Sequence, residues 1–369
     1  MTQWPSNFCG SYRPEDVTFL LKLQPRPEFV DLAQKEHLIQ TGQRHYASML
    51  SLESPPSADY QQLFHAACTA NGPQMAADCL RLAAIIAARR PAGPITLLSL
   101  ARGGTPIGVI LKHLLVQVFA RQVTHYSLSI LRDRGVDDAA LRFVLAAGHT
   151  PESCVFVDGW TGKGVIAREL ASSVAAFNRQ HRCTLDAGLY VLTDLAGAAS
   201  CAASAQDYLI PSSILNATVS GLISRSLLPE ATEPDEFHGC FYYAEYEPVD
   251  KSRAFVGEIL AKAFELEGNG QLPAAAPIDA LALAQISADF IQIALVDNQI
   301  TDPNLIKPGI GEATRVLLRR LPKKLLLRDP AASAVAHLVL LAEHKQVPIQ
   351  VDPNLPYQAV SIIRSALDG

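Results

Sequence analysis

Short apolar runs alternate with longer amphipathic stretches through the middle of the chain. A strand buried on both faces reads as a short apolar run, and a covering helix repeats apolar residues every three to four positions. The runs that fit strands are Ile95–Leu100, Val155–Val157 and Leu189–Asp194, and the stretches that fit helices are Ile107–Phe119 and one that begins at Val165. This alternation predicts an α/β fold with a doubly wound parallel sheet.

The chain before this alternation has mainly helical periodicity. Residues 1–90 predict an N-terminal extension of the same domain, with helices at Glu28–His45 and Pro73–Arg89. After the alternation, residues 212–260 fit no single pattern. We therefore expect one domain over residues 1–266.

A second, small α/β domain is expected over residues 278–369, after a linker at residues 267–277 that is rich in Gly, Pro and Ala. Its expected elements are a helix at Ala280–Leu295, a helix that opens within residues 306–315, a strand at Lys324–Leu327, a helix at Ala334–Glu343 and a strand at Val347–Val351.

Composition is that of an ordinary globular protein. The 369 residues are 49% hydrophobic and 18% charged, and a net charge of −5 excludes a polycation that binds nucleic acid with its whole surface. Seven cysteines form no Cys-x-x-Cys pair, which predicts free thiols in a reducing cytoplasm. The N-terminus has no signal-peptide pattern, and no apolar run reaches the roughly 18 residues that span a bilayer. Neither secretion nor a membrane partner is expected.

Chemistry-bearing residues gather directly after the expected strand at Val155–Val157. They are Asp158, Gly159, Trp160, Thr161, Gly162, Lys163 and Gly164. Glycine lets backbone N–H groups approach an anion, and the following helix N-terminus adds partial positive charge. A carboxylate at the strand end can hold a ribose hydroxyl or reach a metal through water. The loop predicts a phosphate site, and an ordinary tight turn is the alternative.

A second glycine loop follows the expected strand at Ile95–Leu100. It contains Arg102, a bidentate phosphate donor, and then Gly103, Gly104 and Thr105. Taken alone, this loop fits a structural turn equally well. Parallel sheets bind ligands at the carboxyl ends of their strands, where both loops would lie. The two loops together therefore favour a ligand site.

A basic turn lies between the two loops along the chain. A strand-like stretch from His125 ends at Arg132 and Arg134, and Gly135 follows. A solvated charged turn is one interpretation. The position of the turn favours the other, a mobile loop that closes over a polyphosphate.

These three segments resemble those of the type I phosphoribosyltransferases. Asp158 matches the first acid of that family's phosphoribosyl-pyrophosphate (PRPP) loop, and residues 161–164 stand at its phosphate cradle, whereas Gly159 replaces the second acid. More specifically, residues 10–22 and 158–164 resemble divergent phosphoribosyltransferase-like proteins of bacterial tellurite-resistance and stress gene clusters. The resemblance covers roughly residues 8–260.

The resemblance implies transfer of phosphoribose between PRPP and a base, with Mg²⁺ on the diphosphate as cofactor. The implied catalytic residues are Asp158, which would hold ribose, and Arg102, Arg132 and Arg134, which would hold pyrophosphate with the Gly103 and Gly104 amides. The sequence has no motif for a protein-bound metal. The missing second acid favours an alternative, a catalytically degenerate regulatory protein that senses a nucleotide while its C-terminal domain binds RNA. The acceptor base and homodimerisation are left open.

The C-terminal region contains six basic residues with no acid among them. They are Arg315, Arg319, Arg320, Lys323, Lys324 and Arg328. Clustered cations beside a helix N-terminus suit the phosphates of a nucleic acid, and a solvated helix face is the alternative.

Residues 309–315 resemble the recognition helix of the L7Ae and Pelota-type RNA-binding domains. Gly309, Glu312 and Thr314 keep the family's motif, Arg315 replaces its Lys, and Gly311 replaces its Asn. The residues for which the resemblance implies RNA contact are Lys307, Gly309, Gly311, Glu312, Thr314, Arg315, Arg319 and Arg320.

A thiol and an imidazole lie close together in the sequence at His238-Gly239-Cys240. Some relatives of the stress-cluster proteins carry a cysteine-protease label. A Cys–His dyad is assembled by the fold rather than by adjacency, and the aromatic residues after Cys240 are typical of a buried strand. A cysteine protease is therefore a second alternative to the transferase.

Overall fold

The computed structural model describes residues 7–228, 233, 235–271 and 277–364. Its N-terminal unit, residues 7–271 with these gaps, is built around a sheet with strand order β1-β4-β3-β6-β7-β8. The strands are β1 (Thr18–Leu20), β3 (Ile95–Ala101), β4 (Val123–Leu131), β6 (Cys154–Thr161), β7 (Leu189–Asp194) and β8 (Cys201–Ser204). Every neighbouring pair in this order is parallel, which confirms the predicted α/β class.

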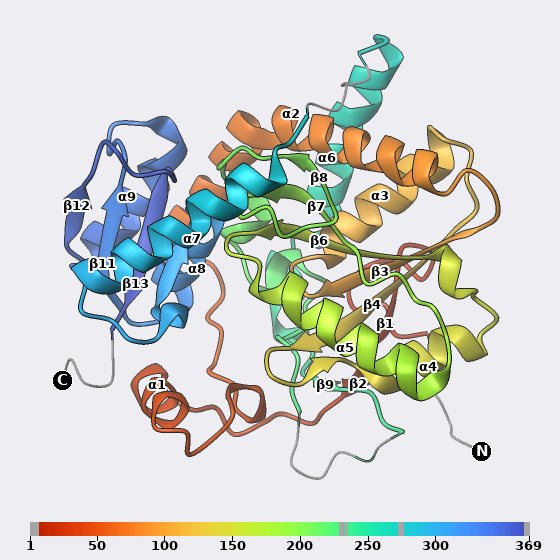
Figure 1. Cartoon of the computed structure of the whole chain (residues 1–369), viewed down its shortest axis with the longest axis horizontal. Coiled ribbons are helices and arrows are strands. Elements are labelled where there is room, and N and C mark those ends of the chain that lie inside the picture. Colours follow the sequence, from red (N-terminus) through yellow and green to blue (C-terminus); the bar gives the residue numbers. More distant parts are fainter. Residues whose placement is uncertain (1–6, 229–232, 234, 272–276, 365–369) are drawn as a thin grey trace.

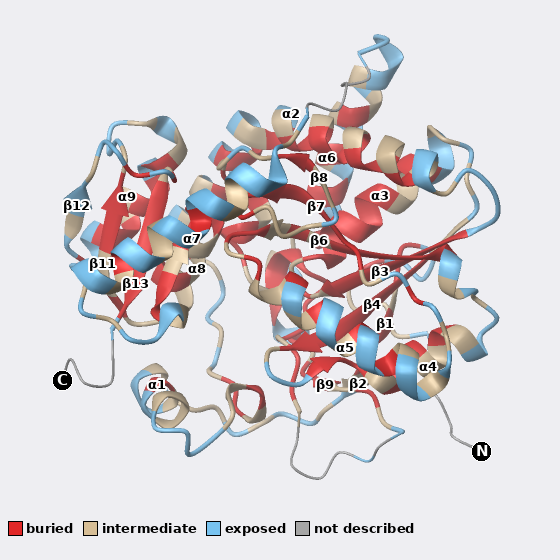
Figure 2. Ribbon diagram, in the orientation of Figure 1, coloured by how far each residue is buried: buried red, intermediate tan, exposed pale blue. Residues whose placement is uncertain are grey.

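Helices cover both faces of this sheet (Figure 1). One face carries α2 (Ala58–Arg89), α3 (Thr105–Gln117) and α6 (Ser252–Gly268), and the other carries α4 (Asp138–Ala146) and α5 (Val165–His181). The central strands are buried along most of their length (Figure 2), because apolar helix faces lie on both sides of them. The sequence shows this as apolar runs without alternation.

The C-terminal unit, residues 277–364, has a separate sheet in the order β10-β13-β11-β12. Its strands are β10 (Ile306–Pro308), β11 (Pro322–Leu327), β12 (Ile349–Val351) and β13 (Ala359–Ile363), and its helices are α7 (Ala280–Asp297), α8 (Ile310–Arg319) and α9 (Ala336–His344). The expected small α/β unit is present, although β10 and the central strand β13 were not predicted from the sequence.

The N-terminal extension differs from the sequence-based expectation. Helix α1 (Leu32–Gln40) is shorter than expected, because Asp31 caps its first turn by accepting hydrogen bonds from two backbone N–H groups. Helix α2 begins 15 residues before Pro73 and continues through it, since residues upstream, such as Phe64, are buried against α6. Strand β1 pairs with β4, so part of the extension belongs to the central sheet.

The segments that gave no clear pattern contain short, irregular elements. Strand β2 (Lys22–Leu23) pairs with β9 (Gly239–Cys240), and β5 (Gly135–Val136) pairs with β4. Helix α6 extends to Gly268, into the expected linker, and residues 272–276 of that linker lie outside the described residues.

One helix of the described part, α7, is long and apolar enough to cross a membrane by length and composition alone, contrary to the expectation from the sequence. It also packs on the small sheet: Ser287 and Ala294 are buried, and the ring of Phe290 lies 5.2 Å from that of Tyr357. The absence of a membrane partner and the cytoplasmic location stay predictions.

The strand order places the two glycine loops side by side. Strand β4 lies on one side of β3 and β6 on the other, so the direction of the winding reverses between β3 and β6. Open α/β sheets bind ligands outside the carboxyl ends of their strands at such a reversal. The loops after β3 and β6 both lie at this point, as expected.

Candidate functional site

A cavity of about 360 Å³ lies where the end of β6 meets the start of α8. Its basic lining residues are Lys35, Arg132, Lys163, Arg225, Lys307, Arg315, Arg319 and Arg320. Its acidic lining residues are Glu36, Asp158 and Glu312. We call this cavity the cationic cleft, because basic side chains outnumber acidic ones by eight to three.

The loop after β6 forms one wall of the cationic cleft. Gly164 has a φ of 72°, which favours glycine, and its N–H donates to the Thr161 hydroxyl at 3.0 Å. A Cβ added at Gly162 would lie 2.8 Å from the backbone oxygen of Pro308. The glycines therefore serve the turn into α5 and the close approach of the two units.

Two charged side chains of this loop have shifted pKa values. Burial, together with the charge of the neighbouring Lys307, lowers the pKa of Lys163 to about 7. The Lys163 ammonium donates to the backbone oxygen of Ile306 at 3.0 Å. Burial raises the pKa of Asp158 to about 6, against the opposing effect of Arg315. Both groups therefore change charge close to neutral pH.

The first turn of α8 is held on the N-terminal unit by Asp207. Its two carboxylate oxygens accept hydrogen bonds from the backbone N–H groups of Ile310 and Gln358, each at 2.8 Å. Gly309, just before the helix, has a φ of 90° and lies against Leu195. This contact fixes which face of α8 points to the sheet.

The face of α8 that carries the Pelota-like motif is turned toward β6. A Cβ added at Gly311 would lie 2.7 Å from Cε2 of Trp160. The guanidinium of Arg315 lies over the Trp160 ring, 4.2 Å from its centroid, and pairs with Glu312 at 3.4 Å. Of the expected RNA-contacting residues, the charged ones therefore line the same cavity as the expected phosphate loop: Lys307, Glu312, Arg315, Arg319 and Arg320.

Charges within the cationic cleft are only partly compensated. Burial would raise the pKa of Glu312, but Arg315, Lys307 and Lys163 lower it below its usual value. Arg320 pairs with Glu36 of α1 through two nitrogens, one of them at 2.8 Å. The three acidic residues that line the cationic cleft are too few to neutralise its eight basic residues.

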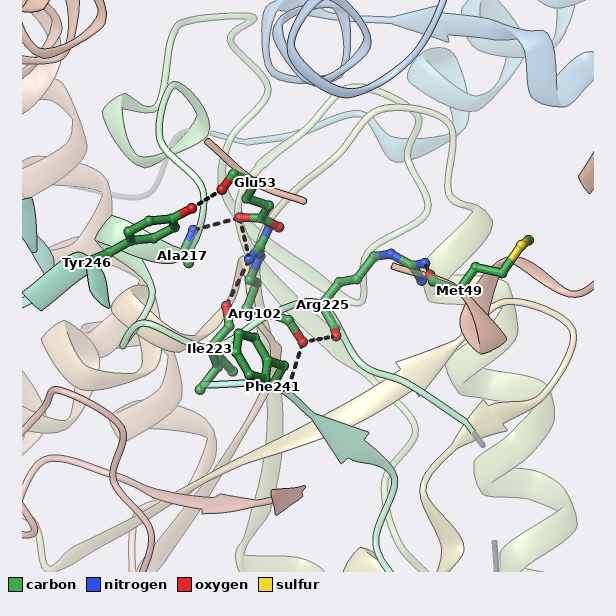
Figure 3. A network of polar contacts seen from close by, with 9 residues as sticks. Met49, Glu53, Arg102, Ala217, Ile223, Arg225, Phe241 and Tyr246 are labelled. Carbon is green, nitrogen blue, oxygen red and sulfur yellow. Dashed lines mark hydrogen bonds and ion pairs between the residues drawn. The ribbon is translucent and has the colours of Figure 1, made fainter. Parts of the chain in front are cut away.

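The polar groups of the loop after β3 are already bonded to other groups of the protein. Arg102 is buried, and its guanidinium pairs with both oxygens of Glu53, at 2.5 and 3.0 Å, and donates to the backbone oxygen of Ile223 at 2.8 Å (Figure 3). The Gly104 N–H donates to Leu100, and the Thr105 hydroxyl bonds to Ser127. These groups do not reach the cationic cleft, and Gly103 packs closely against Arg315.

Five further expected site residues also lie off the cationic cleft. Arg134 lines a separate shallow cavity with Glu169. Gly159, Gly309 and Gly311 pack against neighbouring segments, and the buried Thr314 hydroxyl bonds within α8 and to His337. None of the five lines the cationic cleft, contrary to their expected contact with a ligand there.

Sequence reasoning missed several residues of the site. Lys35, Glu36 and Tyr46 come from the N-terminal extension, Glu53 from the segment before α2, and Arg225 from the unclassified region. None of them follows a strand or belongs to a glycine loop, so no local pattern indicates them.

The cysteines show no arrangement for nucleophilic catalysis in the described residues. All seven are free, and none of them hydrogen-bonds to a described histidine. Burial raises the pKa of Cys240 to about 12, and the ring of His238 bonds instead to Ser129 at 2.8 Å. Only Cys9, Cys183 and Cys201 are partly exposed.

Metal ligands are not clustered either. The part of the chain that the structure describes contains no group of three or more His, Cys, Asp or Glu side chains that could hold an ion. The expected Mg²⁺, which would arrive with a diphosphate, stays a prediction.

Comparisons with known proteins cover both units. Residues 10–260 match the family described as tellurite-like stress resistance cysteine protease StiP, and residues 285–365 match the PELOTA RNA-binding domain. A protein of Acinetobacter baylyi named Cysteine protease StiP is 40% identical over an alignment of 374 residues, which covers 98% of this chain and 96% of that protein.

These matches confirm the resemblance to stress-resistance proteins and to Pelota-type domains. They also show that the prediction of phosphoribosyl transfer is wrong, since the relative and the family are both named for a cysteine protease. The chain belongs to the StiP family of stress-resistance proteins, and its residues 285–365 are similar to the PELOTA RNA-binding domain.

Proposed function

We propose that this protein binds single-stranded RNA in the cationic cleft, with both units contacting one strand. The observation that carries the proposal is the joint wall: the Pelota motif on α8 faces the glycine loop after β6 across a cavity with eight basic and three acidic side chains. Phosphates dominate the affinity of proteins for nucleic acids, and lysine and arginine are the groups that neutralise them.

The lowered pKa values of three lysines in the cationic cleft support an anionic ligand. The pKa of Lys163 and that of Lys35 are each lowered to about 7 by burial, with neighbouring cations adding to the effect. The pKa of Lys307 is also lowered by burial. A phosphate placed among them would favour their charged forms, because an opposite charge within about 4–6 Å does so.

The size of the cavity favours a strand over a duplex. Its volume of about 360 Å³ lies at the small end of ligand pockets, which span roughly 300–1,000 Å³. Duplex RNA is contacted over its wide, shallow groove, whereas proteins take single strands one splayed nucleotide at a time. One nucleotide with its phosphates fits the cationic cleft better than a helix does.

The test is binding of a fluorescein-labelled single-stranded RNA, followed by anisotropy over a series of salt concentrations. The double variant Lys163→Gln/Lys307→Gln should bind more weakly, and its slope of log K against log salt should be smaller by about 1.4, since each single-strand phosphate contact contributes about 0.7. The matched control is Lys262→Gln/Lys345→Gln, which removes two lysines outside the cationic cleft. Equal affinities and slopes for the two double variants would refute the proposal.

A second candidate function is proteolysis by a cysteine nucleophile. It is favoured by the 40% identity, over almost the whole chain, to a protein named Cysteine protease StiP. A reactive thiolate has to reach its substrate, so Cys9, Cys183 and Cys201 are better candidates than the buried Cys240. None of the three thiols hydrogen-bonds to an imidazole within the described part of the chain: Cys9 donates to the backbone oxygen of Gly10, and Cys183 donates to the side-chain oxygen of Asn178.

Hydrolysis of a denatured protein substrate, with and without iodoacetamide, tests this candidate. The serine variants of the three partly exposed cysteines should separate the nucleophile, whose loss abolishes hydrolysis, from the other two. Full activity in the triple variant would exclude these thiols and count against the candidate.

A further inference from the structure

A second cavity, of about 420 Å³, adjoins the cationic cleft and shares three lining residues with it, Lys35, Arg225 and Arg319. Residues 50–57, the segment that leads into α2, form its outer wall. We call it the arginine pocket, because three guanidinium groups line it, those of Arg102, Arg225 and Arg319.

A single carboxylate serves these three arginines. Glu53 is the one acidic residue that lines the arginine pocket, and it pairs with Arg102 through both of its oxygens (Figure 3). It also accepts the N–H of Ala217 at 3.2 Å, and its backbone oxygen accepts the Tyr246 hydroxyl. Burial would raise the pKa of Glu53, but Arg102 and Arg319 lower it below its usual value, so the carboxylate is ionised.

The other two guanidinium groups have no anionic partner in the described residues. Arg225 donates to the backbone oxygens of Tyr46 and Met49, and its Nη1 is buried without a hydrogen-bond partner. The Nε of Arg319 is likewise buried and unpartnered within the described part of the chain. Burial lowers the pKa of Arg225 to about 10 and that of Arg319 to about 9, and Arg102 adds to both shifts.

We propose that the arginine pocket binds a divalent oxyanion, and that Glu53 is an internal anion which competes with it for Arg102. The charge count sets the class: three guanidinium groups and one carboxylate leave two positive charges, and Lys35, whose pKa burial lowers to about 7, adds to them when it is protonated. A phosphate monoester carries about −1.5 to −2 at pH 7 and three strong acceptor oxygens. Guanidinium groups recognise such groups in bidentate fashion, and backbone oxygens, to which Arg225 is now bonded, are weaker partners.

Two sources could supply this chemistry. Because the arginine pocket shares a wall with the cationic cleft, the terminal 5′-phosphate of an RNA strand in the cleft could enter it, and this source rests on the proposed RNA function. The other source is a free inorganic oxyanion, which needs no RNA.

The experiment measures inorganic phosphate binding by calorimetry at constant ionic strength and pH 7, on the full chain. Glu53→Gln removes the competing charge and should tighten phosphate binding at least tenfold. Glu245→Gln makes the same charge change on the exposed partner of Arg26 and should leave affinity unchanged. Arg225→Gln should weaken binding at least tenfold, and Arg319→Gln repeats the test at a side chain whose buried Nε has no hydrogen-bond partner among the described residues, in case the first variant does not fold.

RNA with and without a 5′-phosphate separates the two sources. Tighter binding of the phosphorylated strand, lost in Arg225→Gln, assigns the arginine pocket to the strand end. Equal binding of both strands, together with phosphate binding by the free protein, assigns it to a free oxyanion. The proposal is overturned if Glu53→Gln and Glu245→Gln bind phosphate alike. The double variant of Lys163 and Lys307 tests the proposed RNA function separately, since neither residue lines the arginine pocket.

Discussion

Replacing Asp207 by alanine should loosen the docking of the C-terminal unit on the sheet. Each of its oxygens accepts one backbone N–H of that unit, from Ile310 and Gln358, at 2.8 Å. Hydrogen bonds to a charged group are worth about 1.5–3 kcal/mol each, so two give about 3–6 kcal/mol. Burial raises the pKa of Asp207, so the cost of burying its charge is not fully offset, and we expect the lower value, about 3 kcal/mol.

Amide hydrogen exchange followed by mass spectrometry measures this change directly. Exchange in the first turn of α8 reports local opening, and about 3 kcal/mol makes opening about a hundredfold more frequent. Strand β7, which lies inside the N-terminal unit, should exchange at its usual rate. Asp352→Ala, which removes a carboxylate that bonds to Asn354 within the C-terminal unit, is the control. Unchanged exchange of α8 in Asp207→Ala would refute the docking role.

Three further predictions concern charge, packing and thiols. RNA affinity at constant ionic strength should rise as pH falls from 8 to 5.5, because Lys163 gains a proton near pH 7 and Asp158 is neutralised by a proton near pH 6. Anisotropy titrations that show the opposite trend would contradict these charge assignments. Gly311→Ala should cost about 1–3 kcal/mol in urea unfolding by overpacking against Trp160, and Trp160→Leu in the same chain should recover part of it. Cys240 should react with a thiol reagent only on unfolding, and fast labelling of the native protein there would disprove its burial.

The central sheet was predictable because its strands are long apolar runs that end at glycine turns. Strands β3, β6 and β7 were recognised by that pattern, and their common edge followed from parallel pairing. Strand β1 has three residues, too few for a periodic signal, and its place depends on β4, more than a hundred residues away. The start of α2 was missed because Pro73 indicates a helix boundary locally, while burial along the whole helix decides otherwise.

The site was predictable in part for the same reason. The loop from Asp158 to Gly164 has a local signature, and it does line the cationic cleft except at Gly159. The partners of Arg102 have no such signature: Glu53 lies 49 residues before it, and Ile223 lies 121 residues after it. The sequence therefore predicts the position of a charged residue in the fold but not which buried acid will pair with it.

The charge of the cationic cleft is assembled by docking. The N-terminal unit supplies Lys35, Arg132, Lys163 and Arg225, and the C-terminal unit supplies Lys307, Arg315, Arg319 and Arg320. Bringing like charges together opposes docking. Two contacts offset that repulsion: the hydrogen bonds that Asp207 accepts, and the apolar cluster around α8 that the two units share. An anion bound between the units attracts the cations of both, so electrostatics then favours docking instead of opposing it. A ligand that binds the docked form stabilises it by mass action, so RNA should slow hydrogen exchange in α8. By the same linkage, Asp207→Ala should weaken RNA binding without changing any residue that lines the cleft.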